Sequence, residues 1–251
     1  MNFRLDGRTA FVSGAAGHLG RAMTLVLAEA GAHVIVNGRD ESRLKDFEGE
    51  LKAAGHNCER AAFDVADFDA VRKFFSTRKK LDIVVNNAVS MTPAPFDALD
   101  PSAFDQTYKS SVTAAFEIVR AARPALKASG QGSVINIASM YGLVSPDPRI
   151  YASAKQASPA HYGPAKAALI QLTRHLAAEL GPENIRVNAL VPGPFPRSPD
   201  PEFAGRLASR TMLGRVGEAS EIAGPLLFLA SPASSYVTGT ALIVDGGWTA
   251  W

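Results

Sequence analysis

A tyrosine and a lysine stand four residues apart at the start of an apolar segment, as Tyr162 and Lys166. If residues 162–180 form a helix, this spacing places both side chains on one face, one turn apart. An ammonium beside a phenol favours the phenolate and lowers the tyrosine pKa, which suits proton transfer near neutral pH. A surface pair without a catalytic role has the same spacing, and Tyr151 and Lys155 form a second copy upstream.

A glycine-rich turn near the N-terminus has the composition of a phosphate-binding loop. The apolar run 9–13 ends in this turn, which contains Gly14, Gly17 and Gly20, and a helical pattern follows over 21–30. In a strand, turn and helix unit, the backbone N–H groups and the helix N-terminus receive a pyrophosphate. A second strand over 33–37 favours this interpretation over a turn that only packs a strand against a helix.

The elements that must position these residues alternate along the chain. This alternation predicts one α/β domain over 1–251, a doubly wound Rossmann-type fold with a mostly parallel seven-stranded sheet and helices on both faces. Ligands of such sheets bind beyond the carboxyl ends of the strands. Extended or buried-strand patterns also occur at 57–63, 83–86, 133–138, 186–191 and 241–244, and helical spacing at 40–54, 67–75, 101–128 and 162–180.

Two proline-containing segments interrupt this alternation. Residues 143–160 contain three prolines and residues 191–201 contain five. Because proline is disfavoured in helix interiors and central strands, both segments are predicted to be loops at the ligand-binding edge. We expect a loop insertion at about 143–160 and a substrate lid at about 192–212, since long loops at that edge shape or cover a site.

The composition argues against several functional classes. The 251 residues carry a net charge of +2 with dispersed lysines and arginines, so neither nucleic acid nor a membrane is expected as a partner. The single cysteine, Cys58, cannot form an internal disulfide, and no metal site is predicted. The sequence has no recognisable secretion leader and no membrane-spanning apolar run, so we expect a cytoplasmic protein.

Taken in order, the motifs resemble those of the short-chain dehydrogenase/reductase family, in its single-domain branch, over nearly the whole chain. Any one motif is weak evidence, but the full ordered set is specific. The family implies hydride transfer between a nicotinamide and a carbonyl or alcohol carbon. The matching stretches are residues 13–20, Asp64-Val65, Asn86-Asn87-Ala88, 135–139, Tyr162 with Lys166, Val191-Pro192-Gly193 and Asp245-Gly246-Gly247.

The resemblance implies a role for each motif. Tyr162 would give its proton to the carbonyl oxygen, Ser139 would hold that oxygen, and Lys166 would lower the tyrosine pKa and bond the nicotinamide ribose. Ser111 stands where the family has an asparagine whose backbone carbonyl holds a water of the proton relay. The cofactor would contact Ser13, Gly14, Gly17, His18, Leu19, Gly20, Arg39, Asp64, Val65, Asn87, Ala88, Tyr162, Lys166, Pro192 and Gly193.

Two observations disagree about which tyrosine is catalytic. Tyr151 lies twelve residues after Ser139, close to the usual separation in the family, and Tyr162 lies twenty-three residues after it. However, Lys155 is soon followed by a proline, whereas Lys166 is followed by a long helical pattern. Because a rigid helix holds catalytic geometry better than a loop, we assign Tyr162 and expect Tyr151 to contact the substrate.

The cofactor preference depends on the end of the second strand. NAD-dependent members carry an aspartate there, but this chain has Asn37-Gly38-Arg39. Glycine leaves room and Arg39 can pair with a 2′-phosphate, so the sequence predicts NADP, with NAD as the alternative. One observation argues against NADP. Many NADP-dependent members carry a basic residue inside the glycine turn, but this chain has Gly17 at that position.

We expect a small polar substrate such as a sugar, a polyol or a sugar acid. The candidate contacts are Tyr141, Arg149, Tyr151 and Arg197, and either arginine can bind a carboxylate or phosphate or simply be solvated. Further polar groups in the loops are Asp147, His161 and Asp200.

Two alternatives remain open. A 3-oxoacyl reductase would have a more apolar lid. A cofactor-binding regulator without catalysis is suggested by three departures from the family pattern, His18, Val89 and Ser111. The resemblance also implies a homotetramer, or else a dimer, that associates through the helices at 101–128 and 162–180.

Overall fold

Seven parallel strands form a single sheet in the computed structural model, which describes residues 2–153 and 157–251. Their order is β3-β2-β1-β4-β5-β6-β7, so the chain reverses its direction of travel between β1 and β4, where doubly wound folds bind ligands. The predicted fold class is confirmed. The strands are β1 (Thr9–Val12), β2 (His33–Gly38), β3 (Cys58–Ala62), β4 (Ile83–Asn86), β5 (Gly132–Ile137), β6 (Ile185–Pro192) and β7 (Ala241–Val244).

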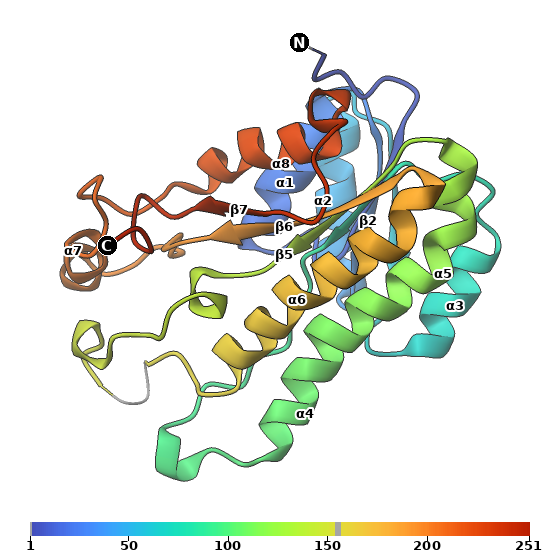
Figure 1. The fold of residues 1–251 in the computed structure, drawn as a ribbon. Helices are drawn as coiled ribbons and strands as arrows, with labels where there is room; N and C mark the ends of the chain where they lie inside the picture. The colour runs from blue at the N-terminus through green and yellow to red at the C-terminus, as the bar shows by residue number, and fades with distance from the viewer. Residues whose placement is uncertain (1, 154–156) are drawn as a thin grey trace.

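Helices cover both faces of the sheet (Figure 1). One face packs against α1 (His18–Glu29), α2 (Glu41–Ala53) and α8 (Ala223–Ala230). The other packs against α3 (Phe68–Ser76), α5 (Ala114–Ser129) and α6 (Tyr162–Leu180). Because side chains alternate along a strand, Ala10 and Val12 of β1 join the first layer and Phe11 joins the second.

The predicted helix over 101–128 is divided by a wider turn. The segment consists of α4 (Ser102–Tyr108), a π-helical turn η2 (Lys109–Thr113) and α5. Within the turn, Ser110 and Ser111 both donate their hydroxyl hydrogens to the Thr107 carbonyl, at 3.3 and 2.6 Å. Such turns often occur at functional sites because they displace the backbone by one residue.

The two proline-rich segments fold against each other beyond the carboxyl ends of the strands, at the left of Figure 1. The lid segment contains a helix that the sequence did not predict, α7 (Pro201–Ala208), which Asp200 caps by accepting a hydrogen bond from Phe203 N at 2.9 Å. Arg206 Nε of this helix donates to the Ile150 carbonyl of the insertion at 2.6 Å. This contact, together with buried Leu207 and Trp248, holds the insertion in place.

Candidate active site

Tyr162 is the first residue of α6, and Lys166 follows one turn later. Lys166 is buried, and its Nζ lies 5.6 Å from the centroid of the Tyr162 ring. Ser139 follows the end of β5 and caps a short 3-10 turn, where its Oγ accepts a hydrogen bond from Tyr141 N at 3.2 Å. The carboxyl end of a strand and the first turn of a helix thus bring Ser139, Tyr162 and Lys166 together.

The protonation of this group is governed mainly by burial. Burial raises the pKa of Tyr162, and a hydrogen bond with the Ser139 hydroxyl partly lowers it. Burial lowers the pKa of Lys166 to about 8. The Lys166 ammonium donates to the Ile137 carbonyl at 2.7 Å, so it interacts with backbone rather than with the phenol oxygen. The expected lowering of the Tyr162 pKa by Lys166 is therefore not seen in this structure.

A cavity of about 440 Å³ runs from the glycine turn past the ends of β4 and β5 to Tyr162. Gly14 lies at its start with φ +63°, and a Cβ added there would come within 2.9 Å of Asn87 Nδ2. The Ser13 hydroxyl accepts hydrogen bonds from the backbone N–H groups of Asn87 and Ala88, at 2.9 and 3.0 Å. These bonds fix the strand-end motif against the glycine turn.

The residues of this cavity fit a phosphorylated dinucleotide. No side chain caps the N-terminus of α1, which begins after Gly17, so its first N–H groups remain available to a phosphate. The Nε2 atom of His18 is buried and has no hydrogen-bond partner within the described ranges. Near the glycine turn, Arg39 lies 3.7 Å from Asp64 and is largely exposed, and Arg43 donates to the Ala16 carbonyl at 3.2 Å.

Most of the predicted cofactor residues line this cavity, with two exceptions. Ser13 lies behind it, bonded as described, and Gly193 lines the second cavity instead. The residues from the prediction that do line it are Gly14, Gly17, His18, Leu19, Gly20, Arg39, Asp64, Val65, Asn87, Ala88, Tyr162, Lys166 and Pro192.

A second cavity of about 610 Å³ lies on the other side of Tyr162. Ser139 and Tyr162 line it, so Tyr162 borders both cavities. Tyr141 and Tyr151 also line it, and their hydroxyl oxygens lie 2.8 Å apart. The remaining wall is largely apolar, formed by residues that include Met91, Pro93, Met140, Pro194, Phe195, Pro196, Phe203 and Leu207.

Other predicted substrate contacts lie elsewhere. Arg149 forms a two-pronged ion pair with Asp147, at 2.9 and 2.7 Å, and its side chain is 82% exposed. Arg197 is exposed and lines neither cavity. The expected contacts of Arg149 and Arg197 with the substrate are therefore not supported, because one guanidinium is already paired and both face solvent. Lys155, the partner proposed for Tyr151, lies outside the described residues.

The side chains of His161 and Ser111 form hydrogen bonds within the protein, and neither residue lines either cavity. The His161 ring is buried, with Nδ1 2.9 Å from Thr107 Oγ1 and Nε2 3.2 Å from the Thr92 carbonyl oxygen. Ser111 lies in the π-helical turn, where its side chain bonds Thr107, and its neighbour Ser110 lines the cofactor cavity instead. The predicted role of Ser111 concerns its backbone carbonyl, and it stays a prediction.

The sequence analysis missed residues of both cavities. Arg43 lies in the first turn of α2, four residues after Arg39, so a search for further basic residues close to the end of the second strand would have found it. The apolar wall residues Met91, Phe195 and Phe203 have no sequence motif, since only tertiary packing brings their loops together. Among residues 2–153 and 157–251 there is no cluster of potential metal ligands and no helix with the length and apolarity of a membrane span.

Comparison with known proteins gives matches along nearly the full chain. The family model described as Enoyl-(Acyl carrier protein) reductase matches residues 14–249. Galactitol 2-dehydrogenase (L-tagatose-forming) from Cereibacter sphaeroides is 37% identical, with 99% of this chain and 98% of that protein covered. A tropinone reductase homolog from Arabidopsis thaliana is 35% identical, with 98% and 93% covered.

A solved structure is also similar throughout. Gluconate 5-dehydrogenase from Burkholderia cenocepacia J2315, in complex with NADP and tartrate, aligns with a TM-score of 0.89 at 32% identity. The alignment covers 100% of this chain and 98% of that one. The shared fold therefore extends over the sheet, both cavities and the loops around them.

Proposed function

Because this chain belongs to the short-chain dehydrogenase/reductase family, we propose that it is an NADP(H)-dependent oxidoreductase that transfers a hydride between the nicotinamide and a carbonyl or alcohol carbon of a small substrate. The observation that carries this proposal is the position of Tyr162. Its side chain borders both a cavity that fits a dinucleotide and a separate cavity of substrate size. An acid–base group is needed at that junction, where the substrate carbon meets the nicotinamide.

NADP rather than NAD is proposed as the cofactor. Arg39 and Arg43 place two guanidinium groups at the outer end of the first cavity, and both can pair with a 2′-phosphate. The Asn37 side chain donates to the Ala61 and Phe63 carbonyls, so it is engaged with the neighbouring strand. The similar gluconate 5-dehydrogenase that was solved with NADP gives further support.

In the proposed mechanism the nicotinamide supplies or accepts the hydride, and the protein handles the proton. During reduction the Tyr162 hydroxyl donates its proton to the carbonyl oxygen, while the Ser139 hydroxyl donates a hydrogen bond to that oxygen. Lys166 lies buried beside Tyr162, with a proton that it can share near pH 8. The apolar wall of the second cavity gives the substrate surroundings of low polarity beside Ser139 and Tyr162.

For the substrate, the similar galactitol and gluconate dehydrogenases support a sugar, a polyol or a sugar acid. A second candidate is a 3-oxoacyl compound, and the specific observation that favours it is the apolar wall formed by Phe195, Phe203 and Leu207. Both candidates require the same proton transfer by Tyr162, so one set of variants tests the chemistry for either.

The test follows NADPH and NADH absorbance with a panel of ketoses, keto acids, cyclic ketones and 3-oxoacyl esters. We expect Tyr162→Phe to lower kcat/KM by about a thousandfold, because general acid catalysis is lost. Tyr151→Phe should retain most activity toward simple ketones such as cyclohexanone, and the fully exposed Tyr236 provides a matched control as Tyr236→Phe. Loss of turnover in Tyr151→Phe alone would assign catalysis to the other tyrosine.

The cofactor assignment is tested in the same assay. Arg39→Ala and Arg43→Ala should each raise the KM for NADPH about tenfold and change the KM for NADH little, since only NADPH carries the 2′-phosphate. Lys45→Ala, an exposed position on the same helix that lines neither cavity, is the control. Protein that binds NADPH but turns over no member of the panel would instead favour the regulator.

A further inference from the structure

We propose that the substrate is an uncharged ketone or secondary alcohol with an apolar body, and that the paired hydroxyls of Tyr141 and Tyr151 bind a second polar group on it. This inference rests on the proposed function and specifies its substrate class. It departs from the sugar, polyol or sugar acid that the sequence predicted, because the described part of the second cavity's wall has no cationic side chain for a carboxylate and is largely apolar.

The wall of the second cavity favours an apolar substrate body. Met140 and Leu207 are buried members of a hydrophobic cluster that also contains Tyr141, Tyr151 and Phe203. On the opposite side, Met91 and Phe195 complete the wall. A fully hydroxylated chain in this cavity would leave hydroxyl groups facing side chains that cannot bond them, at a desolvation cost for each.

Two arginines of the surrounding segments are already engaged by other residues. Arg149 is paired with Asp147, and Arg206 bonds the Ile150 carbonyl and Glu202. Within the described part of the wall, no lysine, arginine or histidine occurs, and the one carboxylate is that of Asp200, which caps α7. A carboxylate substrate would therefore be desolvated without a partner among these residues.

The tyrosine pair is the main polar feature of this wall away from Ser139 and Tyr162. With their oxygens 2.8 Å apart, one hydroxyl donates to the other, and the Ser158 backbone also bonds the Tyr151 hydroxyl. This arrangement leaves one O–H hydrogen of the pair for a ligand. Burial raises the pKa of Tyr141 and of Tyr151, so both remain neutral phenols at working pH. The pair therefore suits a neutral hydroxyl or carbonyl.

Packing holds the pair in place before any ligand binds. Tyr141 lies two residues after Ser139, in the same short turn, so its position is fixed relative to the proposed oxygen-binding hydroxyl. The Tyr151 ring packs against Phe203, with centroids 6.0 Å apart. Because Arg206 holds the neighbouring Ile150 carbonyl, the backbone next to Tyr151 is anchored before a ligand binds, which favours selective binding.

A cyclohexanone series tests this inference. The compounds are cyclohexanone, its 2-, 3- and 4-hydroxy derivatives, 4-oxocyclohexanecarboxylate and the methyl ester of that acid, with L-tagatose as a fully polar ketose. In the wild-type protein we expect at least one hydroxy derivative to have the highest kcat/KM. The ester should exceed the free acid about tenfold, since the unpaired carboxylate costs binding energy.

The tyrosine pair is tested by Tyr141→Phe and Tyr151→Phe. Each should lower kcat/KM for the preferred hydroxy derivative about tenfold, the effect expected from one lost hydrogen bond, and change that for cyclohexanone less than twofold. Equal losses on both compounds would contradict specific recognition. Preference for the free acid, abolished by Lys155→Met, would overturn the inference by identifying a cation for an anionic substrate.

Binding separates failure of the inference from failure of the proposed function. Calorimetry should show tighter binding of the cyclohexanediol that matches the preferred derivative than of cyclohexanol, with the difference lost in Tyr151→Phe. If this difference appears but no ketone is reduced, the cavity assignment stands and the proposed function fails. If Tyr162-dependent turnover appears without any such difference, the function stands and the inference is wrong.

Discussion

At the residue scale, Lys166 shows how burial changes the pKa of a lysine side chain. A solvated lysine titrates near 10.5, but burial lowers the pKa of Lys166 to about 8. The folded chain then binds fewer protons than the unfolded chain between these two values. By linkage, the destabilising effect of burying this charge is therefore relieved as pH rises from about 8 toward 10.5.

This shift gives a direct prediction. In a titration of labelled lysine amino groups by NMR, we expect the amino group of Lys166 to titrate near pH 8 in the cofactor-free protein. This signal should be absent from Lys166→Met. Absence of any signal that titrates near pH 8 in the wild-type protein would contradict the burial of this ammonium.

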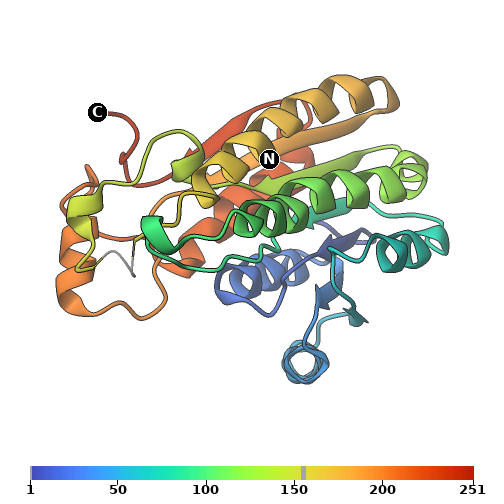
Figure 2. The same cartoon turned by 90° about the horizontal axis from the view of Figure 1, so that it is seen from below.

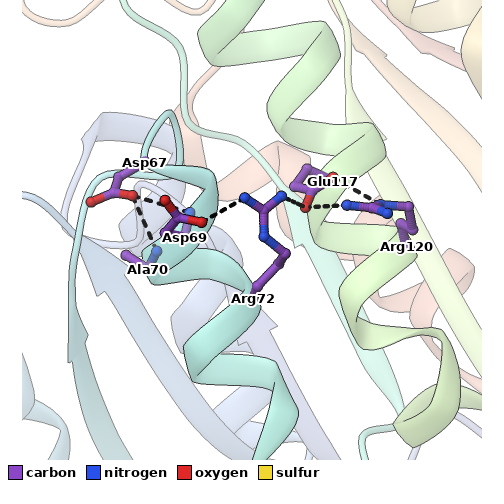
Figure 3. A network of polar contacts seen from close by, with 6 residues as sticks. All are labelled: Asp67, Asp69, Ala70, Arg72, Glu117 and Arg120. Atoms are coloured by element: carbon purple, nitrogen blue, oxygen red, sulfur yellow. Dashed lines mark hydrogen bonds and ion pairs between the residues drawn. The ribbon is translucent and has the colours of Figure 1, made fainter.

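At the element scale, an ion-pair network joins α3 to α5 beneath the sheet. Figure 3 shows Arg72 of α3 between Asp69 of its own helix and Glu117 of α5. Arg120 binds the same Glu117 carboxylate, with contacts of 2.9 and 2.7 Å. The Glu117 side chain is only 6% exposed, while both arginines are about half exposed. The charge on the buried carboxylate therefore depends more on these ion pairs than the charges on the two arginines do.

Glu117 predicts a pH-dependent difference in stability. Hydrogen bonding to Arg120, and then to Arg72, lowers the pKa of Glu117, so its stabilising contribution is complete above the unfolded value of 4.5 and is lost as pH falls below it. We expect Glu117→Gln to lower the free energy of unfolding by about 1–2 kcal/mol at neutral pH.

Denaturant unfolding at pH 7 and at pH 3.5 measures this difference. The difference in the free energy of unfolding between the wild-type protein and Glu117→Gln should be smaller at pH 3.5, because the wild-type carboxyl group is then also becoming neutral. A difference of the same size at both pH values would instead indicate a packing defect. Asp105→Asn, at an exposed position on α4, serves as the control for removing a carboxylate from the same helical segment.

At the scale of the whole molecule, the outer surface of α4 and α5 is unusually apolar. Phe104, Tyr108 and Phe116 are each more than two-fifths exposed along these helices. α5 and α6 lie side by side on this face of the sheet (Figure 2). Exposed apolar patches of this kind mark association surfaces, and these are the segments that the sequence predicted to form one.

We therefore expect a homotetramer, with a dimer as the alternative. Phe116→Glu should shift the sedimentation coefficient toward the monomer, because it introduces a charge into the apolar surface. Tyr236→Glu changes a fully exposed aromatic residue outside these helices and should leave the assembly intact. A wild-type protein that sediments as a monomer at micromolar concentration would contradict the prediction.

The sequence by itself determined the seven strands and most of the helices in their order, with α7 and α8 as the helices that it missed. Strand and helix periodicity, the glycine turn and the spacing of Tyr162 and Lys166 depend on neighbours within a few residues, so the pattern was sufficient to predict them. The π-helical turn at Lys109–Thr113 was not predicted, because its wider bonding pattern leaves no sequence periodicity of its own.

Only the tertiary structure decided which side chains share a cavity and in what charge state. Their sequence positions made Arg149 and Arg197 suitable for binding an anionic substrate, but both side chains face solvent in the structure. The orientation of these loops depends on tertiary contacts, such as the one between Arg206 and Ile150, which are 56 residues apart in the chain. Burial, likewise, set the pKa shifts of Tyr162 and Lys166. These properties depend on residues distant in the chain, which local sequence patterns do not encode.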